Sequence, residues 1–158
     1  MTKYNWVETV ALNKVQKEAL FQLWNAEYPA KIVYDTIADF EIYLNQLYEP
    51  HHYLLMNTDK HILGWAYTFM LEEETWFSIL IGKAGQMKGS GKEILQVFKE
   101  RESKLIRWVI EHDLEFRKDG TRYHSPIGFY LKYGFDVVRD QRLNLQQFTA
   151  VKIKWVRS

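Results

Sequence analysis

One stretch decides the fold of this chain: WFSILIGKAGQMKGSGKEILQVFKERESKLIRWVI, residues 76–110. The apolar runs over 76–81 and 105–110 predict strands, and the apolar spacing between them predicts a helix over 89–101. Two strands joined through a helix run parallel, with a right-handed crossover. Ligands bind beyond the carboxyl ends of such strands, so the loop over 82–91 is the first candidate site.

The segments on either side complete a mixed α/β pattern. Before the crossover we expect two amphipathic helices and then a three-strand antiparallel meander. Asn13 is the expected cap of the first helix, which Pro29 stops, and Asp35 is the expected cap of the second, which Pro50 stops. After it, Pro126 opens a short helix that Gly134 ends. The expected order is β-α-α-β-β-β-α-β-α-β-β, in a single domain over residues 1–158. Strands are expected near 6–10, 53–56, 62–71, 76–81, 105–110, 135–138 and 150–156, and helices near 13–28, 35–49, 89–101 and 126–133.

The composition argues against several classes of protein. The 158 residues carry 21 basic and 20 acidic side chains, and this balance gives no reason to expect nucleic acid or an anionic membrane as a partner. Cysteine is absent, which excludes disulfides, cysteine-ligated zinc and a thiol nucleophile. The five histidines show no metal-ligand spacing, so no metal is expected. Neither a signal peptide nor an apolar run of about 20 residues is visible, and we expect a cytoplasmic protein.

The loop Gln86-Met87-Lys88-Gly89-Ser90-Gly91-Lys92 follows a strand and opens a helix. Glycines let a ligand approach the backbone, and the first helical turn presents free N–H groups and the positive end of the helix dipole. This arrangement binds phosphate groups, although the same glycines could serve only the turn. The Walker A pattern fails, because it needs Gly at 86 and Ser or Thr at 93, where Gln86 and Glu93 stand. The dinucleotide pattern Gly-x-Gly-x-x-Gly fails at Ile94.

Two motifs carry a resemblance to a known family. Residues 86–91, QMKGSG, fit the pattern Gln/Arg-x-x-Gly-x-Gly/Ala at every specified position. Residues 126–135, PIGFYLKYGF, fit a helix that ends in Phe-Tyr-x-x-x-Gly-Phe. In these motifs, and in their order with a strand between them, the chain resembles the GNAT superfamily of N-acetyltransferases. Two early helices followed by a meander are also similar to this family, but only about residues 75–135 carry specific motifs.

The resemblance implies a mixed, mostly antiparallel sheet flanked by helices and splayed where strands 76–81 and 105–110 part. Acetyl-CoA, the acetyl donor, would lie in that splay. Its pantetheine arm would pair with the backbone of Leu80 and Ile81. The acetyl group would pass directly to an amine whose identity the sequence leaves open, and a homodimer is also left open. The pyrophosphate of acetyl-CoA would meet the loop formed by Gln86, Met87, Lys88, Gly89, Ser90, Gly91 and Lys92.

The same resemblance points to catalytic groups. Tyr130 occupies the position of the family's general acid, which protonates the leaving thiolate, although it could be only a core aromatic. A base or a water chain must also take a proton from the amine. Glu111 is the candidate base, His112 is an alternative, and Glu74 belongs to a charged run that better fits a hairpin turn. Backbone N–H groups near residue 81 could stabilise the anionic oxygen.

The chain departs from the family over residues 113–124. Many members carry Asn near the position of Tyr123, and this loop is longer than is common and rich in charge. It could attract an anionic acceptor through Arg117, Lys118 and Arg122, or it could be a solvated insertion. Two other functions stay open. One is a non-catalytic acyl-CoA-binding sensor or regulatory module of the same fold, and the other is a Walker-type nucleotide binder, which the failed pattern disfavours.

Overall fold

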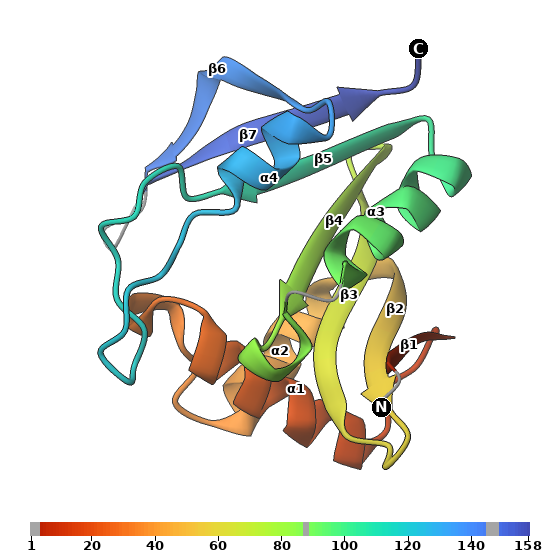
Figure 1. Cartoon of the computed structure of the whole chain (residues 1–158), viewed down its shortest axis with the longest axis vertical. Helices are drawn as coiled ribbons and strands as arrows, with labels where there is room; N and C mark the ends of the chain where they lie inside the picture. The colour runs from red at the N-terminus through yellow and green to blue at the C-terminus, as the bar shows by residue number, and fades with distance from the viewer. Residues whose placement is uncertain (1–3, 87–88, 145–148) are drawn as a thin grey trace.

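The computed structural model describes residues 4–86, 89–144 and 149–158 (Figure 1). Its seven strands form one sheet in the order β1-β2-β3-β4-β5-β7-β6. The predicted order of strands and α-helices is confirmed. In chain order the elements are β1 Tyr4–Thr9, α1 Lys14–Glu27, the 3-10 turn η1 Ala30–Ile32, α2 Ile37–Gln46, β2 Tyr48–Asn57, β3 Ile62–Leu71, β4 Glu74–Ile81, the 3-10 turn η2 Lys83–Gly85, α3 Ser90–Arg101, β5 Lys104–Val109, α4 Ile127–Lys132, β6 Asp136–Asn144 and β7 Thr149–Val156.

The sheet is mixed and mostly antiparallel, as the sequence predicts. Strands β1 to β4 pair antiparallel in turn, and β7 pairs antiparallel with both β5 and β6. Strands β4 and β5 are parallel, and α3 connects them. The charged run between β3 and β4 forms the predicted hairpin turn, because Glu72 and Glu73 have positive φ angles of 52° and 64°.

The helix ends follow local capping, with one departure from expectation. Asn13 caps α1 in a capping box, as its position predicts. Helix α2 is capped by Thr36 and not by Asp35, and it ends at Gln46. Pro50, expected to stop that helix, lies inside β2 where the pairing with β3 shifts register, and a proline without an N–H is tolerated at such a bulge. No helix in the described ranges is long and apolar enough to cross a bilayer.

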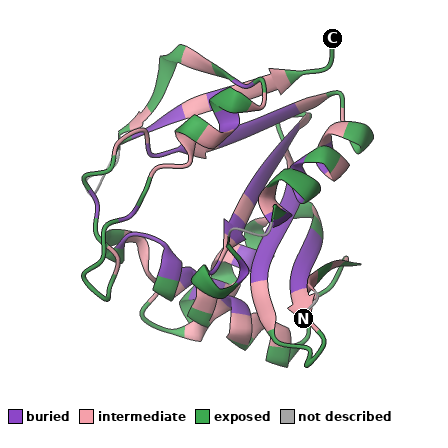
Figure 2. Ribbon diagram, viewed as in Figure 1, coloured by how far each residue is buried: buried purple, intermediate pink, exposed green. Residues whose placement is uncertain are grey.

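Helices cover both faces of the sheet. On one face, α3 and α4 pack over a core that includes Phe98 and Tyr130. On the other face, α1 and α2 pack over a second core that includes Leu20, Phe40 and Trp65. Figure 2 shows the buried residues along the central strands and the exposed ones on the outer sides of the helices. The gap between β4 and β5 is where groups from both faces can meet.

Candidate functional site

Strands β4 and β5 separate after a single pairing. Trp76 and Ile106 are the only residues of the two strands in register with each other, and beyond them the strands diverge in a V (Figure 1). The carbonyl oxygen of Ile79 accepts a hydrogen bond from Arg107 Nη1 at 3.3 Å, across this gap. The carbonyl oxygen of Ile81 accepts one from Gln86 Nε2 at 2.9 Å. The predicted parting of the two strands is therefore present, and side chains reach into it.

The open edge of β4 presents its backbone groups at alternate residues. Since the carbonyl of Ile79 points toward β5, the backbone groups of Leu80 point toward β3, where Leu80 pairs with Trp65. Gly82 continues this alternation, because its N–H donates to Leu63 of β3. The geometry thus favours Ile79 and Ile81 as the residues that can pair with a ligand in the gap. The expected pairing of a ligand with the backbone of Leu80 does not fit this geometry, because those groups face β3.

The glycine loop leads into α3 beside the end of β4. Gly89 is the N-cap, with a left-handed φ of 74°, and no side chain caps the first turn. A Cβ atom on Gly91 would lie 3.5 Å from Phe129, an ordinary contact, so packing within the protein does not require glycine there. Free first-turn amides and this small residue fit a site that an anionic ligand approaches closely. Met87 and Lys88 of the predicted site lie outside the described residues.

Tyr130 lies on α4 with its hydroxyl inside the protein. Its side chain is 2% exposed and packs edge-on against Phe77 and Phe135. Its hydroxyl oxygen accepts a hydrogen bond from Arg107 Nη1 at 2.5 Å. Burial raises the pKa of Tyr130, and the guanidinium of Arg107 opposes that rise without cancelling it. The phenol is therefore protonated at neutral pH and has its own proton to give.

Arg107 is the site residue that sequence reasoning missed. It lies on β5, is 7% exposed, and its guanidinium stands over the rings of Tyr130 and Phe77 at 5.4 and 6.0 Å. In the part of the chain that the structure describes, no carboxylate forms an ion pair with it. The available signal was a lone arginine in the apolar run LIRWVI, where charged residues are rarely buried without a function.

A cavity of about 480 Å³ lies between α1, α2 and the parting strands. Two hydroxyl pairs face one another there: Tyr28 with Ser78 at 3.2 Å, and Tyr43 with Tyr67 in a short hydrogen bond. Its lining is rich in aromatic residues and comprises Trp24, Tyr28, Lys31, Ile32, Tyr34, Tyr43, Tyr67, Phe69, Trp76, Phe77, Ser78, Arg107, Trp108, Val109, Ile110, Tyr123, Leu143 and Ala150. No aspartate or glutamate is among these described residues. Nor do the described ranges hold a cluster of His, Asp and Glu suited to a metal ion.

The predicted base candidates lie outside this cavity. A carboxylate oxygen of Glu111 accepts a hydrogen bond from Arg142 of β6 and is held in that ion pair. His112 Nδ1 accepts from the backbone N–H of Leu114. Glu74 pairs with Lys104 of β5 at 3.2 Å, at the closed end of the V. A role for Glu111 as base stays a prediction, and it would require Glu111 to release Arg142.

The loop over 113–124 is attached to the end of α1. Arg117 Nε donates to the backbone oxygen of Glu27 at 3.0 Å and lies 3.8 Å from the buried carboxylate of the same residue. Arg122 donates to the backbone oxygen of Asp113, which closes the loop on itself. Tyr123, at the end of the loop, lines the cavity. Two of the three basic side chains expected to attract an acceptor therefore hold the loop together.

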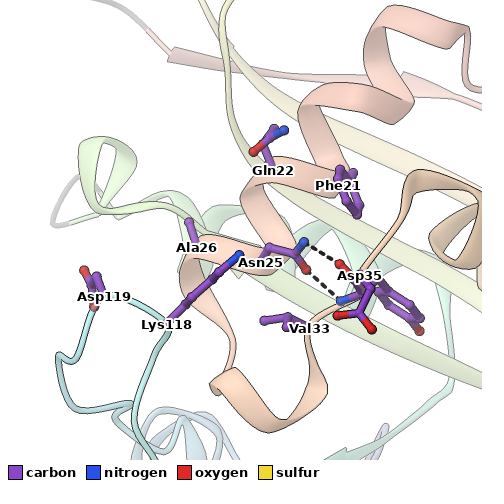
Figure 3. A pocket seen from close by; sticks show the side chains of 9 residues that line it. Phe21, Gln22, Asn25, Ala26, Val33, Asp35, Lys118 and Asp119 are labelled. Atoms are coloured by element: carbon purple, nitrogen blue, oxygen red, sulfur yellow. Dashed lines mark hydrogen bonds between the residues drawn. The ribbon is translucent and has the colours of Figure 1, made fainter.

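A second hollow of about 540 Å³ lies beside α1 (Figure 3). Asn25 borders it and holds the backbone of Tyr34 through two hydrogen bonds, of 2.8 and 2.9 Å. The remaining described lining residues are Phe21, Gln22, Ala26, Val33, Asp35, Lys118 and Asp119. No residue of β4, β5, α3 or α4 is among them. Arg107, the hydrogen-bond partner of Tyr130, lines the first cavity and not this one, although the second hollow is slightly larger.

Comparison with known proteins identifies the fold. No family model and no curated sequence matches the chain significantly. Among solved structures, the ribosomal-protein-S18-alanine N-acetyltransferase from Escherichia coli matches with a TM-score of 0.67 and 15% identity, covering 100% of this chain and 95% of that one. A GNAT superfamily phosphinothricin acetyltransferase from Sinorhizobium meliloti, in complex with acetyl-CoA, matches with 0.66 and 10%, covering 97% and 89%.

An aminoglycoside 6′-N-acetyltransferase complexed with coenzyme A gives a TM-score of 0.67 and 12% identity, covering 96% of each chain. At these identities the likeness shows the fold alone. The chain has the fold of the GNAT acetyltransferases, as the sequence motifs predict. The acceptors named for these three proteins differ from one another, so the shared fold does not indicate which acceptor this chain would take.

Proposed function

We propose that this chain is an N-acetyltransferase that moves the acetyl group of acetyl-CoA directly to an amine. The observation that carries the proposal is the gap between β4 and β5, with the buried hydroxyl of Tyr130 beside it and the uncapped start of α3 next to the end of β4. Two of the similar structures were solved with coenzyme A or acetyl-CoA bound, which supports acetyl-CoA as the donor.

The described residues fit acetyl-CoA in two places. The amides of the first turn of α3, at Ser90, Gly91 and Lys92, suit the pyrophosphate, because they lack side-chain caps and lie at the positive end of a helix of 12 residues. The open edge of β4 at Ile79 and Ile81 suits the amide groups of the pantetheine arm, since a free strand edge pairs with an extended chain. Gln86 would have to keep or exchange its hydrogen bond to Ile81.

In this proposal, two side chains of the protein, Tyr130 and Arg107, take part in the transfer. Bound acetyl-CoA supplies an activated acetyl thioester. A carbon–nitrogen bond forms to the amine while the carbon–sulfur bond breaks, and Tyr130 donates its proton to the departing thiolate. The guanidinium of Arg107, which already donates to the hydroxyl oxygen of Tyr130, stabilises the negative charge that develops there. No carboxylate of the described residues lines the cavity, so the proton that the attacking amine loses as the amide forms would pass to water, and water would return a proton to the oxygen of Tyr130.

Ligand binding and turnover test the proposal separately. At a concentration of acetyl-CoA near 100 times its dissociation constant, linkage stabilises the folded state by about 2.7 kcal/mol. For a chain of this length that is a rise in Tm of roughly 5–10 °C. ATP with magnesium should give far less, because the Walker pattern fails. Release of free thiol from acetyl-CoA, followed across a panel of primary amines, then measures transfer.

The outcomes distinguish the rival functions. A rise in Tm with acetyl-CoA and amine-dependent thiol release would support the transferase. A rise in Tm without thiol release for any amine would favour an acyl-CoA sensor of the same fold. Stabilisation by ATP and none by acetyl-CoA would refute the assignment of the loop over 86–92.

A further inference from the structure

We infer that the acceptor is an α-amino acid with an apolar or aromatic side chain, and that its carboxylate binds Arg107. This inference rests on the proposed acetyltransferase function and names the class of substrate that the cavity would accept. It assigns to Arg107 a role in recognition, in addition to its contact with Tyr130.

The charges around the cavity favour an anionic group. Its described lining holds two cations, Lys31 and Arg107, and no carboxylate. Lys31 is half-exposed and pairs with Glu115 at 3.2 Å. Arg107 is buried, and the described residues offer it hydrogen bonds only through Nη1, to Ile79 and Tyr130. A buried cation without a counter-ion is costly, and a carboxylate in the cavity would relieve that cost through Nε and Nη2.

The position of Arg107 sets where the amine of such a ligand would lie. Its Nη1 is 2.5 Å from the hydroxyl of Tyr130, the group assigned to the leaving thiolate. In an α-amino acid the amine nitrogen is about 2.5 Å from the carboxyl carbon, two covalent bonds away. A carboxylate bound at Arg107 would therefore bring an α-amine close to the reacting groups, whereas an amine at the end of a long chain would be carried away from them.

The rest of the cavity suits an apolar side chain. The rings that line it come from α1, α2, β3, β4 and β5 and from the connecting segments at Tyr28, Tyr34 and Tyr123. Its volume of about 480 Å³ lies in the range of small-molecule sites. The hydroxyls of Tyr43 and Tyr67 hydrogen-bond to each other, and those of Tyr28 and Ser78 do the same, so these four polar groups of the lining are already paired. A polyamine would place several positive charges beside Arg107 and Lys31 without a carboxylate to meet them.

The test compares acceptors that differ only in the carboxyl group. Thiol release from acetyl-CoA is measured with L-phenylalanine, L-leucine and L-methionine, with the primary amide of each, and with spermidine. We expect kcat/KM for the best amino acid to exceed that for its amide by at least about tenfold, and spermidine to be poorer still. The α-amine of an amino-acid amide is less basic than that of the free acid and is more often neutral. This difference alone would favour the amide, so a preference for the acid cannot come from it.

Two variants locate the preference. Arg107→Gln keeps a hydrogen-bond donor for Tyr130 but removes the charge, so the ratio of kcat/KM for the acid to that for the amide should fall to about one or below. Arg107→Lys is the charge-conserving comparison, and it should keep a preference for the acid over the amide. Lys104→Gln removes a cation of the same strand that does not line the cavity, so it is the matched control and should change the ratio by less than about threefold. The ratio is internal to each variant, so a general loss of rate does not affect it.

Each result decides the inference. Equal or better turnover of the amides, or of spermidine, would overturn it while leaving the acetyltransferase in place. An unchanged ratio in Arg107→Gln would also overturn it and would restrict Arg107 to positioning Tyr130. If no amine is acetylated, binding still decides: L-phenylalanine should raise the Tm of the protein loaded with acetyl-CoA more than its amide does, and the reverse order would refute the inference.

Discussion

Replacing Tyr130 by phenylalanine removes one hydroxyl and keeps the ring that packs against Phe77 and Phe135. The hydroxyl is buried and accepts a hydrogen bond from the guanidinium of Arg107. Loss of a hydrogen bond to a charged group costs about 1.5–3 kcal/mol of the free energy of unfolding. For a chain of this length the Tm should fall by roughly 3–12 °C, and the variant should remain folded at 25 °C.

The effect on rate should be larger than the effect on stability. General acid catalysis contributes about 100- to 10,000-fold. Because water can replace part of it, we expect Tyr130→Phe to lower kcat by at least about 30-fold, which is 2 kcal/mol of barrier. The KM for acetyl-CoA should change by less than about threefold, since the loop at the start of α3 is untouched and the acid acts only in the transition state.

The assay is thiol release per folded protein, with the best amine of the panel, alongside a melting curve. Tyr133→Phe is the matched control, because it lies next to α4, loses the same hydroxyl, and that hydroxyl makes no hydrogen bond within the described residues. A lower Tm alone does not identify Tyr130 as the general acid, since loss of the hydrogen bond from Arg107 would lower the Tm whether or not Tyr130 is catalytic. A normal kcat in folded Tyr130→Phe would refute the catalytic role and leave Tyr130 as a core residue.

The remaining predictions concern the loop, a buried histidine and the attachment of the 113–124 loop. Gly89→Val should weaken acetyl-CoA binding at least about tenfold, or 1.4 kcal/mol, by isothermal titration, because valine disfavours a φ of 74°; Gly120→Val, with a φ of 87°, should lose stability but not affinity. Burial, with a smaller contribution from the neighbouring histidine, lowers the pKa of His52 from 6.5 to about 4 in the folded protein. As the pH falls from 6.5 to 4, the imidazole of His52 is therefore protonated in the unfolded chain but not in the folded one. The free energy of unfolding measured by urea should therefore fall by about 2 kcal/mol between pH 7 and 4.5 on this account, a loss that His52→Gln abolishes and the exposed control His61→Gln retains. Arg117→Met should lower the free energy of unfolding by about 3 kcal/mol at pH 7, since the carboxylate of Glu27 at the end of α1 would be buried unpaired. An unchanged urea midpoint would show that this ion pair does not hold the loop.

Local patterns were enough to predict the order of the elements. Apolar spacing, the capping box at Asn13, the charged turn at Glu72 and Glu73, and the glycine that ends α4 all act between residues close together in the chain. Pro50 was expected to stop the second helix, and this was wrong, because a proline can follow the end of a helix or lie at a bulge in a strand. The register shift between β2 and β3, which places it in a strand, depends on a partner strand farther along the sequence.

The motifs of the loop and of α4 also came from sequence alone, and with them the GNAT fold. They predict a phosphate-binding helix start and a tyrosine near the gap, since both predictions rest on short segments. That Ile79 and Ile81, and not Leu80, present backbone groups to the gap is decided by the register with β3. A shift of one residue would reverse it, and the two-residue turn at Glu72 and Glu73 fixes that register; only the parting of β4 from β5, which leaves this edge open, depends on the tertiary structure.

The character of the pocket was decided by the tertiary structure. Arg107 meets Tyr130 across 23 positions of the chain, and Tyr28 meets Ser78 across 50. In sequence, Arg107 is only a charge in an apolar strand, and the tyrosines of the lining are scattered over several elements. Our inference that this charge recognises a carboxylate depends on its burial without an acidic partner. Burial is a property of the packed molecule, because it depends on which elements come together around a side chain.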